Sequence, residues 1–326
     1  MKRALITGAA GQDGTYLTEL LLLKGYEVWG VVGPEPGEYL AWAAAHEERL
    51  HVCDADLADA ASLDRLIAEV VPDEVYNFAA ISSVALSWEH PALVSDIDAT
   101  GVARLLEVLR RRAPRARLCQ ATSAEIFGEA VESPQTEETP IRPVTPYGSA
   151  KAHAHFLVRN AREGWGMFAC SAILYNHESP RRPPSFVTRK ITDGAARIKA
   201  GLATELRLGN LDAARDWGFA GDYVEGMWRI LQADAPDDYI LATGESHTVR
   251  DFCEAAFSRL DLGWSEHIVV DPEFFRPVDR QAPVGDAAKA RSVLGWEPRT
   301  TFREVVEMMV DADVERLASA PPLQAR

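Results

Sequence analysis

The sequence predicts an α/β fold: a doubly wound, mostly parallel sheet with a smaller mixed α/β part. Three observations lead to this expectation. Short apolar runs alternate with amphipathic helical stretches along the first 175 residues, a glycine-rich turn joins the first strand to the first helix, and small or polar residues follow several strands. Such alternation is typical of parallel sheets that bind ligands at the carboxyl ends of their strands.

The first strand and helix form a Rossmann-type unit. We predict a strand at 3–7, a helix at 16–24 and a second strand at 27–32. Between the first strand and the helix stand Gly8, Gly11 and Gly14. Glycines let the backbone approach a pyrophosphate, and the helix start offers unpaired N–H groups to it. This unit therefore predicts a bound dinucleotide.

The end of the second strand should select between NAD and NADP. An acidic residue there binds a ribose 2′-hydroxyl, whereas an arginine binds a 2′-phosphate. The chain has Gly33-Pro-Glu-Pro-Gly37, with neither residue type at the strand end itself and Glu35 only nearby. The residues thus leave both cofactors open.

Further strands and helices continue the alternation. We predict strands at 50–53, 74–78, 117–121 and 167–175, and helices at 60–70, 93–112 and from Tyr147 onward. Asp56, Ala80 and Ser123 fall at carboxyl ends of these strands, as Gly11 does. The carboxylates near Asp56 suit an adenine amino group, and the small Ala79 and Ala80 let a cofactor lie close.

From Asn176 the pattern is mixed. We expect a loop at 176–184, helices at 186–201, 222–232, 249–260 and 302–317, short strands at 205–208 and near Tyr239 and Ile268, and a frayed tail at 318–326. This gives a dinucleotide-binding domain at 1–175 and a mainly substrate-binding part at 176–326, interleaved with the first.

The second part places arginines near turns: Arg181, Arg182, Arg189, Arg215, Arg276 and Arg280. Arginines gathered in loops suggest a phosphate site, while ordinary surface ion pairs are the alternative. Arg215, between a glycine turn and a helix, carries the most weight.

The net charge and the cysteine positions argue against several classes of binding partner and metal site. The net charge of −15 argues against nucleic acid or an anionic membrane surface as partner. The four cysteines are widely scattered and have no metal-ligand spacing, so we expect buried thiols in a reducing compartment and no metal. No signal peptide or membrane-spanning run is evident, so we expect a cytoplasmic protein.

Tyr147 and Lys151 lie one helical turn apart, at the start of a predicted helix. A lysine beside a phenol favours the phenolate, so we predict a lowered pKa for Tyr147 and a base that takes a proton from an alcohol. A serine or threonine hydroxyl at the end of the preceding strand would hold that alcohol. The alternative is a polar helix that simply faces water.

Several longer strings resemble one family. These are TGAAGQDGTYL at 7–17, NHESPRR at 176–182, FVTRKI at 186–191, LGNLDAARDWG at 208–218 and DDYILATGE at 237–245. With them the chain resembles the extended short-chain dehydrogenase/reductases, and most of all the GDP-mannose 4,6-dehydratase family. The resemblance spans essentially the whole chain.

The resemblance implies a nucleotide-sugar 4,6-dehydratase, a hydro-lyase with a tightly bound nicotinamide cofactor that is recycled in each turnover. Tyr147, paired with Lys151, would take the proton of the sugar 4-hydroxyl, which Ser123 would hold. Glu125 would then take the C5 proton before the 6-hydroxyl leaves as water. The family uses NADP.

The resemblance also implies binding residues. For the cofactor they are Gly8, Gly11, Gln12, Asp13, Gly14, Asp56, Leu57, Phe78, Ala79, Ala80, Ser82, Tyr147, Lys151, His177 and Arg182. For the nucleotide-diphosphate sugar they are Ser83, Asn176, Val187, Lys190, Arg215 and Arg276. The expected assembly is a homodimer.

The chain departs from the family at three places. Ala124 stands where related dehydratases carry a residue that protonates the leaving hydroxyl. Gly33–Pro36 replace Arg-Arg-Ser-Ser, which leaves NADP preference and a tetramer open, and Leu93 replaces a tyrosine. Two alternatives therefore stand beside the dehydratase: a reductase or epimerase of a GDP-4-keto-sugar, and a non-catalytic nucleotide-binding protein.

Overall fold

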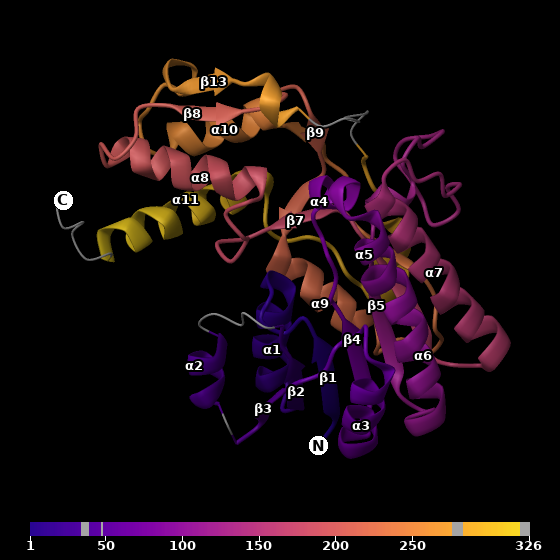
Figure 1. The fold of residues 1–326 in the computed structure, drawn as a ribbon. Coiled ribbons are helices and arrows are strands. Elements are labelled where there is room, and N and C mark those ends of the chain that lie inside the picture. The colour runs from indigo at the N-terminus through magenta and orange to yellow at the C-terminus, as the bar shows by residue number, and fades with distance from the viewer. Residues whose placement is uncertain (34–38, 47, 276–282, 320–326) are drawn as a thin grey trace.

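A seven-stranded parallel sheet forms the centre of the structure (Figure 1). The structure is a computed structural model that describes residues 1–33, 39–46, 48–275 and 283–319. The strands of the sheet are β1 (Arg3–Thr7), β2 (Glu27–Val31), β3 (Leu50–Cys53), β4 (Glu74–Asn77), β5 (Arg117–Ser123), β6 (Ala169–Leu174) and β11 (Tyr239–Leu241). The order is β11-β6-β5-β4-β1-β2-β3. The predicted doubly wound α/β fold is confirmed, and its strand order reverses between β1 and β4, where such sheets bind ligands.

Side chains of the sheet alternate between two cores. Ala4 and Ile6 of β1 face one apolar cluster, while Leu5 between them faces the other. The first cluster includes residues of α1 (Gln12–Leu23), α2 (Tyr39–Ala44) and α9 (Ala220–Ile230). The second includes residues of α3 (Ala60–Val70), α6 (Gly101–Arg112) and α7 (Pro146–Trp165). Helices therefore cover both faces of the sheet.

The later part of the chain builds a second, smaller body over the carboxyl ends of the strands (Figure 1). Its elements are β7 (Asn176–Glu178), α8 (Val187–Lys199), β8 (Leu206–Leu208), β9 (Ala214–Arg215), β10 (Trp217–Phe219), β12 (His247–Thr248), α10 (Val249–Ser258), β13 (Ile268–Val270) and α11 (Phe302–Ser319). A buried ion pair between Arg189 of α8 and Asp313 of α11, 2.6 Å long, ties two of its helices together.

The remaining elements are short. They are α4 (Val84–Glu89), α5 (Pro91–Ser95), the π turns η1 (Asp96–Thr100) and η5 (Ala290–Leu294), and the 3-10 turns η2 (Ala124–Ile126), η3 (Trp264–Glu266) and η4 (Pro272–Phe274).

The structure differs from the sequence predictions at several elements, including these three. Helix α1 begins at Gln12 rather than Tyr16, because the glycine turn itself supplies its first turn. The segment expected as a loop at 176–184 begins with strand β7, which pairs in parallel with β10. The helix predicted at 93–112 is interrupted by the π turn η1, which buries Asp98. The tail beyond residue 319 lies outside the described residues.

In the described part of the chain, no helix is both long and apolar enough to cross a membrane. The four cysteines are free, and three of them are buried. No group of three or more potential metal ligands occurs among the same residues.

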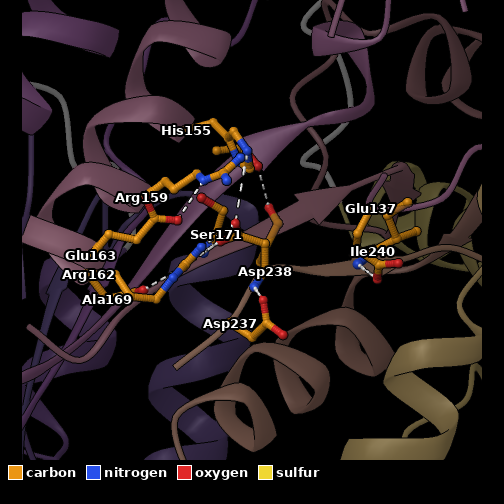
Figure 2. A network of polar contacts seen from close by, with 12 residues as sticks. Glu137, His155, Arg159, Arg162, Glu163, Ala169, Ser171, Asp237, Asp238 and Ile240 are labelled. Atoms are coloured by element: carbon orange, nitrogen blue, oxygen red, sulfur yellow. Dashed lines mark hydrogen bonds and ion pairs between the residues drawn. The ribbon is translucent and has the colours of Figure 1, made fainter. Parts of the chain in front are cut away.

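A buried polar network joins the C-terminal half of α7 to β6 and the start of β11 (Figure 2). Arg162 donates to the two carboxylate oxygens of Asp238 at 2.9 and 2.6 Å, and the Ser171 N–H donates to the same carboxylate at 2.9 Å. His155 Nε2 lies 4.0 Å from it. Burial alone would raise the pKa of Asp238, but hydrogen bonds from Arg162 and the charge of His155 lower it.

We expect Asp238→Asn to lower the free energy of unfolding by about 3–5 kcal/mol, because Arg162 stays buried without its counter-charge. The lowered pKa of Asp238 means that its stabilisation is present above about pH 4 and is lost as the pH falls through the folded-state pKa. Denaturant titrations across pH should therefore show the wild-type advantage shrinking in acid. An advantage independent of pH would contradict this assignment.

Candidate active site

A cavity of about 1090 Å³ lies between the carboxyl edge of the main sheet and the second body. Its walls come from the glycine turn, the ends of β4, β5 and β6, the start of α7, and the segments around β7, α8 and β9. Sites for one drug-sized ligand measure about 300–1,000 Å³. The cavity is therefore larger than a site for one drug-sized ligand requires.

The glycine turn has the form that a pyrophosphate requires. Gly8 has a positive φ of 69°, and a Cβ added at Gly14 would lie 2.3 Å from the Gly8 carbonyl oxygen. Gly11 precedes α1 without a side-chain cap, so the first N–H groups of the helix face the cavity wall. The positive end of the helix dipole adds to this anion-binding character. The residues present thus fit a dinucleotide.

Asp13 and His177 are brought together across the cavity wall. His177 Nε2 lies 3.0 Å from Asp13 Oδ2, and Gln12 Nε2 donates to the His177 carbonyl at 3.1 Å. Burial alone would lower the pKa of His177, but the Asp13 carboxylate raises it above its ordinary value. The same pairing lowers the pKa of Asp13, although burial acts in the opposite direction. This pair fastens the glycine turn to β7.

Ser123 and Glu125 stand at the end of β5 and line the cavity. The Ser123 hydroxyl accepts a hydrogen bond from the Glu125 N–H at 3.2 Å, which starts the 3-10 turn η2. The turn directs Glu125, only partly buried, to the same wall as Ser123. Ala124 lies between them and is buried, so it offers no proton donor there.

Tyr147 and Lys151 lie on one face of α7, as predicted, and both are buried in the cavity wall. The predicted lowering of the Tyr147 pKa is wrong. Burial raises the pKa of Tyr147, and the carboxylates of Asp98 and Glu125 add to the rise, against the smaller effect of Ser123. Lys151 Nζ lies 5.7 Å from the centre of the tyrosine ring and donates to the Ala121 carbonyl at 3.2 Å.

Gly148 allows the start of α7 to approach η2. A Cβ added there would lie 2.6 Å from the Glu125 carbonyl oxygen. We expect Gly148→Ala to separate Tyr147 from Glu125, to lower kcat, and to reduce the free energy of unfolding by about 1–3 kcal/mol.

Gly164, near the other end of α7, is the matched control because nothing lies within 4 Å of a Cβ added there. Gly164→Ala should leave kcat unchanged and stabilise the helix by up to about 1 kcal/mol. Equal kcat values for Gly148→Ala and the wild type would show that the close approach of α7 to η2 at Gly148 does not affect catalysis.

Most of the predicted binding residues line the cavity. On the cofactor side these are Gly8, Gly11, Gln12, Asp13, Gly14, Phe78, Ala79, Ala80, Ser82, His177 and Arg182, and on the substrate side Ser83, Asn176, Val187, Lys190 and Arg215. Asp56 and Leu57 do not line it: Leu57 is packed in the core, and Asp56 accepts a hydrogen bond from the Ala58 N–H. Arg276 lies outside the described residues.

The arginines predicted for phosphate binding divide into two groups. Arg182 and Arg215 line the cavity. Arg181 pairs with Glu19 at 2.7 Å, and Arg189 pairs with Asp313, so these two form ion pairs away from the lining. Arg280, like Arg276, lies outside the described residues.

Sequence reasoning missed other residues of the site. Glu178 stood inside one of the quoted strings but received no role; it lines the cavity and lies 3.1 Å from Arg182. Phe274 also lines it, with Lys190 Nζ 3.7 Å from the centre of its ring. The sequence signal that could have identified Phe274 is its position, with Phe275, next to a predicted phosphate-binding arginine. No sequence signal pointed to Asp98, which is buried and whose charge acts on Tyr147 and Lys151.

Comparison with known proteins agrees with this geometry. Residues 5–309 match the family described as GDP-mannose 4,6 dehydratase. GDP-mannose 4,6 dehydratase 2 of Arabidopsis thaliana is 49% identical, with 96% of this chain and 87% of the relative aligned.

Two solved structures share the fold. UDP-glucose 4-epimerase of Thermus thermophilus, in complex with NAD, has a TM-score of 0.82 and 27% identity over 95% of this chain and 98% of its own. RMD from Pseudomonas aeruginosa, complexed with NADPH, has a TM-score of 0.83 and 24% identity over 97% and 100%.

Proposed function

The chain belongs to the GDP-mannose 4,6-dehydratase family, and from this premise we propose that it converts GDP-mannose to the 4-keto-6-deoxy nucleotide sugar with loss of water. One observation carries the proposal. Ser123, Glu125, Tyr147 and Lys151 all line one cavity together with the glycine turn. An alcohol-activating pair and a separate carboxylate beside one dinucleotide site suit oxidation followed by elimination.

The chain binds a nicotinamide cofactor in this proposal. The glycine turn would hold the pyrophosphate, and the cavity-lining residues Phe78 to Ala80, Ser82, His177 and Arg182 would hold the rest of the cofactor. A nicotinamide held there would supply the hydride chemistry of the reaction, taking hydride from C4 of the sugar and returning it to C6. The carboxylate of Asp13 is occupied by His177, so it does not oppose the phosphates as a free charge.

The protein's own residues move the protons. Tyr147 Oη takes the proton of the 4-hydroxyl, and the Ser123 hydroxyl orients that group. The Lys151 ammonium supports the phenolate that the raised pKa otherwise disfavours. The C5 proton becomes acidic once C4 is a ketone, and the Glu125 carboxylate takes it.

Loss of water then needs a proton on the 6-hydroxyl. Ala124 has none to give, so Glu125 passes on the proton that it took from C5. C5 takes a proton from solvent as hydride reaches C6, and Tyr147 releases to solvent the proton that it took, so both residues return to their starting state. A single carboxylate thus serves as base and acid.

The test is to incubate the purified protein with GDP-mannose and no added cofactor. Formation of the 4-keto-6-deoxy product without net cofactor consumption supports the dehydratase. Turnover only with added NAD(P)H and a 4-keto sugar points to a reductase, inversion of the sugar to an epimerase, and no turnover of any nucleotide sugar to a binding protein.

The cofactor released on denaturation decides between NAD and NADP. The family resemblance favours NADP, while Gly33 is the last described residue before the segment that would read the 2′-phosphate.

We further propose a homodimer through α5 and α7, which expose Leu93 and Phe156 on neighbouring helices. Sedimentation equilibrium should give twice the chain mass; a monomer or tetramer would refute it.

A further inference from the structure

Ser179 is a buried polar residue that none of the reaction steps above uses. It follows β7, is 0% exposed and is not among the residues that line the cavity. Its hydroxyl donates to Oε1 of Gln12, the first residue of α1, at 2.8 Å and accepts from the Arg181 N–H at 3.1 Å. A hydroxyl has one proton to donate, so Ser179 commits that proton to the glycine turn.

The Gln12 carboxamide depends on Ser179 for its orientation. Gln12 is 7% exposed, and its Nε2 donates to the His177 carbonyl and to Asp13 Oδ1, each at 3.1 Å. A carbonyl and a carboxylate can only accept, so the amide nitrogen faces them and the amide oxygen faces Ser179. Without the Ser179 hydroxyl, Oε1 would be left in a buried site without a donor, which is costly.

The same side chain joins two walls of the cavity. Gln12 and His177 both line it, although they are 165 positions apart in the sequence. The ion pair between Asp13 and His177, 3.0 Å long, joins the same two walls. Gln12, Asp13, His177 and Ser179 thus form a buried clasp between the glycine turn and β7.

We propose that Ser179 is a positioning residue for the cofactor: by orienting the Gln12 carboxamide it keeps this clasp closed and slows the release of a bound nicotinamide dinucleotide. The first N–H groups of α1 are suited to a pyrophosphate, and the clasp fixes the residue at which that helix begins. A cofactor that is recycled in each turnover has no need to leave the site. This inference rests on the proposed function and adds a residue that acts from behind the cavity wall.

Ser179→Ala tests the proposal because it removes the donated hydrogen bond at a residue that does not line the cavity. The purified protein is loaded with NADPH, or with NADH if denaturation releases NAD, and is then mixed with excess oxidised cofactor. The decay of nicotinamide fluorescence gives the release rate, which we expect to be about tenfold faster in Ser179→Ala than in the wild type.

Ser171→Ala is the matched control. Ser171 is also 0% exposed, and its hydroxyl has no hydrogen-bond partner among the described residues. The release rate should therefore equal that of the wild type.

Gln12→Met breaks the same hydrogen bond from the other side, and is the second variant should Ser179→Ala fold poorly. Release should again be faster, and adding Ser179→Ala to Gln12→Met should accelerate it no further, because the hydroxyl then has no carboxamide to orient. A wild-type release rate in either single variant, or a full additional acceleration in the double variant, would overturn the proposal. A wild-type protein that binds no nicotinamide cofactor would instead refute the proposed function, so the two failures are distinguishable.

Discussion

Glu125→Gln is expected to reduce formation of the 4-keto-6-deoxy product by about 10²–10⁴-fold, the usual contribution of a general base. The amide cannot take the C5 proton, yet the groups that oxidise C4 remain intact. Reduced nicotinamide and the 4-keto hexose should therefore accumulate on the enzyme after GDP-mannose is added. Absorbance of the bound reduced cofactor and mass analysis of the sugar measure this.

The control for this variant is Glu163→Gln. Glu163 is exposed near the end of α7, where it pairs with Arg159, and its loss should change neither activity nor the cofactor signal. Product formation at the wild-type rate in Glu125→Gln would remove Glu125 from its role. The water-loss step would then need another acid and base in a cavity where Ala124 offers none.

Tyr147→Phe is expected to lower kcat by about 10²–10⁴-fold, because no group then takes the 4-hydroxyl proton as hydride leaves. Unlike Glu125→Gln, this variant should show no reduced cofactor, since the block precedes hydride transfer. The raised pKa of Tyr147 also predicts that wild-type kcat keeps rising with pH through the neutral range, as a growing fraction of the phenol loses its proton.

Tyr239→Phe supplies the comparison for Tyr147. Tyr239 is buried on β11 and is not among the residues that line the cavity, so this change should leave kcat near the wild-type value. Reduced cofactor accumulating in Tyr147→Phe would show that oxidation proceeds without the phenol, against the proposed role.

The regular half of the fold was predictable because its signals are local. The apolar runs at 3–7 and 50–53 predict both ends of their strands correctly, and the helix at 60–70 is amphipathic throughout. The start of α1 was missed because Gln12, Asp13 and Gly14 interrupt the apolar pattern. Strand β7 was missed because Asn176–Glu178 carry no strand pattern, and its pairing with β10 depends on residues forty positions later.

The site was predictable where it follows from strand ends and less so where it depends on packing. Ser123 and Ala80 end parallel strands, so their meeting in one cavity follows from topology. The environment of Tyr147 does not, because its pKa is governed by burial and by Asp98, about fifty residues earlier in the chain. An isolated aspartate inside a helical pattern is typical of a solvated face. The π turn buries Asp98, and its charge then acts on Lys151.

Intramolecular return of hydride is the central feature of the proposed reaction. GDP-mannose deuterated at C4, incubated with the purified protein and no added cofactor, should give 4-keto-6-deoxy product with the deuterium at C6. Deuterium that is lost to solvent, stays at C4, or appears only in an added cofactor pool would contradict the account.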